Sequence, residues 1–172
     1  MTGVQTCALP ISNLRREAQL RDIDPARLIF APRLPLAEHL ARHHAADLFL
    51  DSFPCNAHTT ASDALWAGLP VLTCAGHTLA SRVAASLLSA IGLPELITTS
   101  LEEYERHART LALQPTRLAT LRHRLAQNRL TTPLFDTERF TRHLEKAFDA
   151  MIARQDAGLA PDHLRITATD AV

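Results

Sequence analysis

Residues 47–74 read DLFLDSFPCNAHTTASDALWAGLPVLTC, and this stretch decides the fold. The apolar run DLFLD at its start is typical of a buried strand, and the run PVLTC at its end is typical of another. Between them lie a polar loop and a predicted helix over 59–67, which Gly68 and Pro70 would end. Short strands that alternate with helices predict a parallel sheet with right-handed crossovers.

The same alternation continues on both sides of this stretch. We therefore expect an α/β fold, with a Rossmann-like parallel sheet, flanking helices and a helical tail. A partial lobe is expected over 13–113, and a tail that completes it over 114–172. Ser100 and Glu103 have the spacing of a capping box at the start of one helix. Further helices are predicted at 13–21, 36–44, 80–91, 101–113, 115–128 and 137–157, and further strands at 27–31 and 96–98.

The first twelve residues, MTGVQTCALPIS, differ in composition from the Arg-, Ala- and Leu-rich sequence that follows and fit neither a helical nor a strand period. They lack the positive charge and the apolar length of a signal peptide. Residues 4–11 match the translation of a sequencing adapter. We therefore expect 1–12 to be a non-native or disordered N-terminus.

Composition limits the partners of this chain. Its 172 residues suffice for one domain or for a piece of a larger one. A formal net charge of +0 and an aromatic content of 5% give no reason to expect nucleic acid or an anionic membrane as a partner. The three cysteines form no Cys-x-x-Cys pair, so we expect a reducing, cytoplasmic location.

The chemistry-bearing motif is His58-Thr59-Thr60, which opens the helix after the first strand of the quoted stretch. Free backbone N–H groups and the positive end of the helix dipole favour an anion at that position. Asp63 lies one turn further in, where a carboxylate can accept hydrogen bonds from ribose hydroxyls. The motif predicts a pocket for a nucleoside diphosphate, although the same residues would also serve as an ordinary helix cap.

Histidines and other reactive side chains elsewhere give weaker signals. His39 and Arg42 share one helical face and could hold a base or a phosphate, or only face solvent. His39 and His43 also share a face, but no neighbouring acid or thiol completes a metal site, so no metal is expected. Trp66 is interpreted as a core residue.

Several segments, in the same order, resemble the C-terminal catalytic lobe of the O-linked N-acetylglucosamine transferases. Their residues are more similar to those of bacterial members than to those of animal members. The resemblance implies one lobe of a GT-B glycosyltransferase. It covers most of the chain after residue 26 and rests on ADLFLD at 46–51, CNAHTT at 55–60, DALWAG at 63–68, TLASRVAAS at 78–86, PLF at 133–135 and PDH at 161–163.

Carried over by position, the resemblance implies how UDP-N-acetylglucosamine is bound. His58, Thr59 and Thr60 would contact the diphosphate, and Asp63 would bind the ribose hydroxyls. No residue of this chain is assigned as catalytic. The donor is a substrate, and the resemblance implies a reaction with no cofactor and no metal.

The same resemblance implies the rest of the donor cleft. His39 would lie against the uracil, and Arg42 would help to form that wall. Cys55 and Asn56 would line the donor side. Leu36 stands where animal members have a lysine near the base, which puts recognition of the uracil in doubt.

The mechanism implied is inverting transfer of N-acetylglucosamine to a Ser or Thr hydroxyl of a protein. The family binds its protein acceptor through tetratricopeptide repeats that precede the matched region. The second catalytic lobe and a phosphate-stabilising lysine of the family also lie upstream of that region. Lys146, the only lysine here, falls in the distal helix and cannot replace it. We therefore expect this chain alone not to turn over.

Three other functions remain open. A SPINDLY-type protein O-fucosyltransferase would share the lobe and use GDP-fucose. A non-catalytic nucleotide-sugar-binding module would keep the fold without the activity. A sugar-nucleotide epimerase is the weakest alternative, because its acids and histidine cannot be placed in this sequence.

Overall fold

The computed structural model describes residues 5–167, which divide into two compact units, one up to His39 and one from Leu40 onward. This division differs from the expected breaks after Ser12 and Leu113, and that three-part organisation stays a prediction. The helices are α1 (Gln5–Gln19), α2 (Leu36–Arg42), α3 (Thr59–Trp66), α4 (Val83–Ala90), α5 (Leu101–Leu113), α6 (Pro115–Asn128) and α7 (Thr137–Asp156).

The second unit contains a parallel sheet in the order β1-β2-β3, which confirms the predicted fold class. Phe49 pairs with Val71, and Thr73 pairs with Ile97. All of β2 is buried, as expected of a central strand with helices on both faces. The strands are β1 (Phe49–Leu50), β2 (Val71–Cys74) and β3 (Ile97–Thr98).

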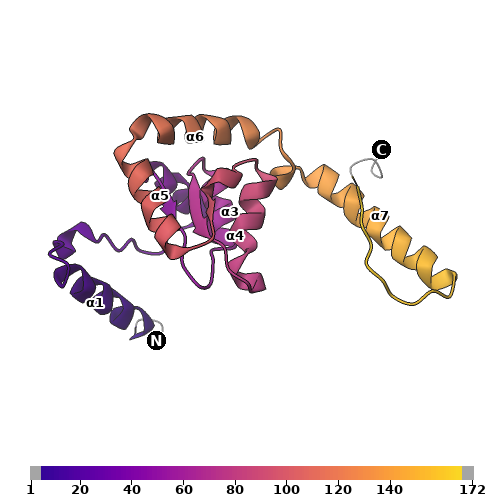
Figure 1. Cartoon of the computed structure of the whole chain (residues 1–172), viewed down its shortest axis with the longest axis horizontal. Coiled ribbons are helices and arrows are strands. Elements are labelled where there is room, and N and C mark those ends of the chain that lie inside the picture. Colours follow the sequence, from indigo (N-terminus) through magenta and orange to yellow (C-terminus); the bar gives the residue numbers. More distant parts are fainter. Residues whose placement is uncertain (1–4, 168–172) are drawn as a thin grey trace. The chain divides into compact units, whose positions relative to one another are not determined.

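Helices cover both faces of this sheet (Figure 1). α3 and α4 pack against each other and against β2. α5 packs against β2 and β3, and α6 packs against α5. Short 3-10 turns connect these elements: η1 (Pro25–Arg27), η2 (His43–Ala45), η3 (Leu79–Ser81), η4 (Pro94–Leu96) and η5 (Pro133–Phe135).

The hydrophobic core lies between the sheet and its helices. Burial of these apolar side chains is the main favourable contribution to folding. The large apolar residues shielded completely from solvent come from several elements: Leu65, Val71, Leu72, Leu88, Ile91, Leu93, Leu96, Leu111 and Leu125.

The strand predicted at 27–31 is wrong. Arg27 belongs to η1, and the residues after it form no regular element. The Ile29 side chain is 89% exposed, while the Phe30 ring lies under the Arg15 guanidinium at 5.3 Å. An apolar run becomes a strand only where a neighbouring strand pairs with its backbone, and Pro32 can donate no ladder hydrogen bond.

The first helix differs from the prediction as well. α1 begins at Gln5 rather than at residue 13, and it contains Pro10. Part of the segment expected to be disordered is therefore helical. That residues 1–12 are non-native stays a prediction. No helix within residues 5–167 is both long and apolar enough to cross a membrane.

Local signals at the helix ends agree with the structure. Gly68 follows α3 with φ +85°, a left-handed conformation that glycine adopts without strain. The Ser100 hydroxyl caps α5 by accepting from the Glu103 N–H over 3.1 Å. The Glu103 carboxylate reaches the Thr99 N–H at 3.0 Å rather than that of Ser100, so the predicted capping box is displaced by one residue.

Trp66 is half exposed and not a core residue, contrary to the sequence interpretation. Its ring meets Phe135 edge to face, with 5.1 Å between the ring centroids. The Arg129 guanidinium lies 5.4 Å from the Trp66 ring centroid and donates to the Trp66 carbonyl over 2.6 Å. The indole therefore connects the end of α3 to the segment between α6 and α7.

Candidate functional site at the start of helix α3

The candidate site begins where β1 ends. The loop 52–58 leaves the carboxyl edge of the sheet, which is where ligands bind in folds of this kind. Asp51 is buried, and its Oδ1 accepts from the N–H groups of Ser52 at 2.8 Å and Ala57 at 2.6 Å. One carboxylate thus holds both ends of the loop.

The interior of the loop is held by Asn56. Its Nδ2 donates to the carbonyl oxygens of Ser52 at 3.0 Å and Cys74 at 3.4 Å. Its backbone N–H donates to the Ala80 carbonyl at 2.9 Å. Its Oδ1 is buried and has no hydrogen-bond partner among the described residues. Asn56 therefore connects the loop to β2 and to the next loop of the sheet edge.

That next loop, 75–81, follows β2. The Gly76 N–H donates to the Ser81 carbonyl at 2.8 Å, and Thr78 and Ser81 form a capping box at η3. A Cβ on Gly76 would lie 2.5 Å from the Ser81 Oγ, so only glycine fits this close approach. The Ala80 carbonyl, presented by this turn, also lies 3.4 Å from His58 Nε2.

The first turn of α3 is open to an anion. His58 is the residue before the helix, and its side chain makes no capping hydrogen bond. An α-helix leaves its first N–H groups without partners inside the helix, so these groups are available to an acceptor. Thr59 and Thr60 are exposed beside them, and Asp63 is half-buried one turn further on.

The structure places six of the eight predicted donor-binding residues on one loop and the start of one helix, and the other two on α2. Asn56, His58, Thr59, Thr60 and Asp63 all lie on the loop and the first turns of α3. The exposed thiol of Cys55 lies on the same loop. His39 and Arg42 lie on α2, where His39 ends the N-terminal unit. Their part in the site stays a prediction.

Two residues that the sequence did not indicate hold Asp51, and with it the loop. The Thr73 hydroxyl on β2 donates to Asp51 Oδ2 at 2.6 Å, and the Tyr104 hydroxyl on α5 donates to the Asp51 carbonyl at 2.9 Å. Burial, then the charge of Asp51 and that of Cys74, raises the pKa of Tyr104 to about 12. Tyr104 therefore stays protonated as a donor. An acid at the carboxyl end of a strand was the available signal for Asp51.

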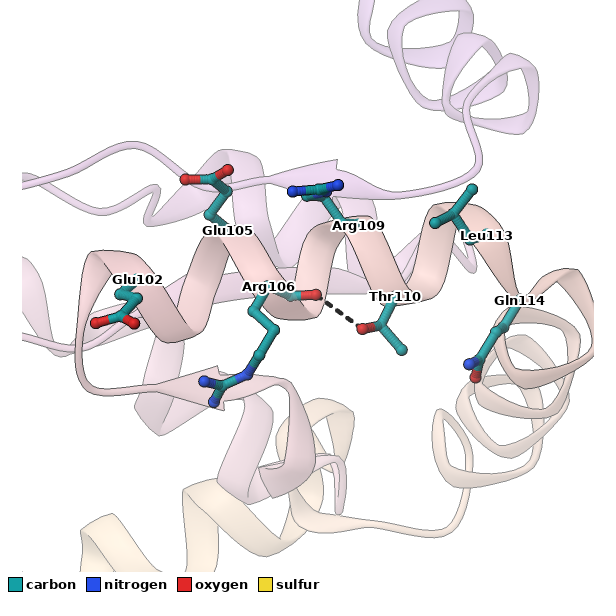
Figure 2. Close-up of a pocket in the computed structure, with 7 residues that line it drawn as sticks. All are labelled: Glu102, Glu105, Arg106, Arg109, Thr110, Leu113 and Gln114. Atoms are coloured by element: carbon teal, nitrogen blue, oxygen red, sulfur yellow. Dashed lines mark hydrogen bonds between the residues drawn. The ribbon is translucent and has the colours of Figure 1, made fainter.

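A cavity of about 450 Å³ lies along α5, and none of the predicted donor residues lines it (Figure 2). Its lining mixes two acids, Glu102 and Glu105, with two arginines, Arg106 and Arg109. The Thr110 hydroxyl is already used, since it donates to the Arg106 carbonyl at 2.8 Å. This lining forms an open, charged helix face and indicates no particular ligand.

The histidines, cysteines and acids of residues 5–167 nowhere gather in a group of three or more that could hold a metal ion. His43, part of the weak metal signal, is buried in η2. His107 is half-buried on α5, and burial, then Arg117, lowers its pKa. A neutral His107 packs into the fold and is not part of the loop-and-helix site.

Comparison with known proteins agrees with this geometry. The family model described as "Glycosyl transferase family 41" matches residues 7–144. A protein from Arabidopsis thaliana named as a probable UDP-N-acetylglucosamine–peptide N-acetylglucosaminyltransferase SEC is 40% identical over 157 residues. That alignment covers 91% of this chain and 16% of the plant protein. A protein from Caenorhabditis elegans named as a UDP-N-acetylglucosamine–peptide N-acetylglucosaminyltransferase is 36% identical, over 88% of this chain and 13% of its own length.

A solved structure gives the same result in three dimensions. The chain superposes on a mutant O-GlcNAc transferase from Thermobaculum terrenum with a TM-score of 0.79 and 34% sequence identity. The superposition covers 87% of this chain and 29% of that one. The resemblance and the fold class derived from the sequence are confirmed. The chain spans about one sixth or less of the two curated relatives described above.

Proposed function

Because this chain belongs to glycosyl transferase family 41, we propose that it forms the donor-binding part of an inverting glycosyltransferase. The enzyme would move N-acetylglucosamine from UDP-N-acetylglucosamine to Ser or Thr hydroxyls of proteins. The names of the plant and nematode relatives support this donor and a peptide acceptor. The protein acceptor would be bound by repeats that precede the matched region in the family.

One observation carries the proposal: α3 begins, without a side-chain cap, at His58-Thr59-Thr60 on the carboxyl edge of a parallel sheet. A diphosphate placed there would accept from the first-turn N–H groups and from the two hydroxyls, and would meet the positive end of the helix dipole. Asp63, one turn further in, would accept from the ribose hydroxyls.

The same groups would serve the chemical step. As the sugar–phosphate bond breaks, negative charge develops on the departing UDP. Fixed N–H groups and the side chains of His58, Thr59 and Thr60 would stabilise the added charge of the departing UDP more strongly than the lesser charge of the bound diphosphate ester, which lowers the barrier. We propose that no metal ion is needed for this. UDP binding by the purified chain that is unchanged after a chelator removes metal ions would support that proposal.

The remaining donor contacts extend the pocket toward the base. We propose that His39 lies against the uracil with Arg42 beside it, and that Cys55 and Asn56 line the donor side of the cleft. Leu36 opens α2 and is 66% exposed. Beside the base, its side chain would offer an apolar contact and no hydrogen bond. A fucosyltransferase of the SPINDLY type, which would prefer guanine, remains the principal rival.

Titration calorimetry of the purified chain with UDP tests the proposal. Asp63→Ala should weaken UDP binding about tenfold, the value of one or two lost hydrogen bonds. Asp149→Ala, at an exposed acid on α7, is the matched control and should leave the affinity unchanged. Equal affinities in the Asp63 variant and the control would remove the ribose assignment.

Activity and location follow from the same proposal. The chain alone should not transfer sugar to a peptide acceptor, and detectable transfer by the purified chain would overturn this. We propose a cytoplasmic location, supported by free thiols at Cys55 and Cys74, which suit a reducing compartment.

A further inference from the structure

Asp51 is a buried acid whose carboxylate is held by hydrogen bonds on both oxygens. Its side chain accepts three hydrogen bonds, from Ser52 N, Ala57 N and Thr73 Oγ1, all between 2.6 and 2.8 Å. Only 6% of the residue is exposed. A carboxylate in such a position tolerates the loss of water because these donors replace it.

The three hydrogen-bond donors to Asp51 lie at the two ends of loop 52–58 and on β2. Ser52 opens the loop 52–58, and Ala57 is the residue before His58, at the loop's far end. Thr73 belongs to β2, the rigid central strand, which is buried throughout. The carboxylate thus fixes both ends of the loop relative to the sheet, and through Ala57 it fixes the residue that leads into α3.

We propose that Asp51 is a positioning residue for the diphosphate site: its carboxylate holds loop 52–58 so that the first turn of α3 faces the ligand. This inference rests on the function proposed above and adds to it a residue that touches no substrate. Asp51 would orient His58, Thr59 and Thr60 through its hydrogen bonds to the loop, as supporting residues orient ligand-binding groups in other sites.

Two substitutions separate holding the loop from carrying a charge. Asp51→Asn and Asp51→Ala both remove the negative charge. The asparagine keeps an oxygen that can accept from Ser52 and Ala57, and its amide can donate to the Thr73 hydroxyl. The alanine keeps neither. Any difference between the two variants therefore reports the hydrogen bonds and not the charge.

The first measurement needs no ligand. Hydrogen exchange followed by NMR should show the Ser52 and Ala57 amides exchanging at least about tenfold faster in Asp51→Ala than in Asp51→Asn, because local opening sets these rates. Amides of β2 should be unaffected. Asp47→Ala, at an exposed acid just before β1, is the control and should change neither amide. Unchanged Ser52 and Ala57 exchange in Asp51→Ala would overturn the proposal.

The second measurement compares UDP with uridine, which lacks the diphosphate. Asp51→Ala should lower the ratio of UDP affinity to uridine affinity about tenfold or more relative to Asp51→Asn, with uridine affinity little changed. A general structural defect would weaken both ligands equally, and that result would overturn the proposal. Failure of the unsubstituted chain to bind UDP would contradict the proposed function, while the exchange rates would still decide whether Asp51 holds the loop.

Thr73→Val covers the case in which Asp51→Ala does not fold. It removes only the hydroxyl that holds Asp51 Oδ2 and nearly keeps the shape of the side chain. Faster exchange at Ala57 and a lower UDP-to-uridine ratio would support the proposal. An unchanged exchange rate together with an unchanged ratio would overturn it.

Discussion

The Tyr104 hydroxyl donates to the backbone carbonyl of Asp51 over 2.9 Å, across 53 positions of sequence. This bond ties α5 to the end of β1, directly beneath the loop that leads into α3. α5 contributes no predicted ligand contact, but through Tyr104 it holds the backbone at the start of the loop.

Tyr104 should ionise only in strong alkali. It is the chain's only tyrosine, so tyrosinate absorbance reports it alone. We expect a midpoint of about 12 in the folded chain, against 10.0 for an unburied tyrosine. Between these values the folded chain holds a proton that the unfolded chain has lost, so stability should fall as the pH rises. A midpoint at the ordinary value would contradict the burial of the phenol beside the Asp51 charge.

Removal of that hydroxyl should also be measurable at neutral pH. Tyr104→Phe leaves the ring in place and should lower the free energy of unfolding by about 1 kcal/mol, the usual net value of one hydrogen bond. Urea denaturation of the two proteins gives the difference. No change in the midpoint would mean that water replaces the phenol at no cost.

His107 should make the fold sensitive to acid. Its pKa is lowered by burial and then by Arg117, so below the ordinary value of 6.5 the unfolded chain binds a proton more readily than the folded chain. Stability is therefore retained above that value and lost as the pH falls through it. His107→Gln should flatten this part of a stability profile measured by urea denaturation. A profile equally steep in the variant would exclude His107 as the cause.

The turn at Gly76 should tolerate no side chain. A Cβ there would lie 2.5 Å from Ser81 Oγ and 2.9 Å from Ser81 Cβ, and Ser81 is held by its capping box with Thr78. Gly76→Ala should cost about 1 to 3 kcal/mol of stability through overpacking. Ser81→Ala, measured in parallel by thermal unfolding, gives the cost of losing the cap alone. A Gly76 variant as stable as the parent would contradict this packing.

Leu50 and Leu72 are register partners with opposite environments. Leu72 on β2 is fully buried, and Leu50 on β1 is 56% exposed. Leu72→Ala should cost about 2 to 5 kcal/mol, the range for cavities in a core. Leu50→Ala is the matched control and should cost much less. Similar losses at both positions would show that β1 is covered in solution.

Local patterns predicted the elements around the site well. The runs that became β1, β2 and β3 are short and apolar, and α3 begins at Thr59 as expected because the polar residues before it break the strand. The run at 27–31 has the same apolar composition but lacks a neighbouring strand, and pairing cannot be predicted from composition. The half-exposed position of Trp66 could not be predicted for a similar reason, since its partners Phe135 and Arg129 lie far along the chain.

The candidate site divides in the same way. The loop and first-turn residues, from Cys55 to Asp63, could be placed together because they are neighbours in sequence. The hydrogen bonds of Asp51 to Thr73 on β2 and Tyr104 on α5 could not be predicted, because these residues meet it only after folding. A buried network of this kind leaves no periodic signal in the sequence.

The most direct test of the central claim is calorimetric titration of the unsubstituted chain with UDP and, in parallel, with GDP. A nucleotide-diphosphate pocket of the proposed kind should bind UDP more tightly than GDP. A preference for GDP would contradict the proposed donor and favour the fucosyltransferase alternative. Absence of binding by a chain shown to be folded would contradict the claim that this segment binds the donor by itself.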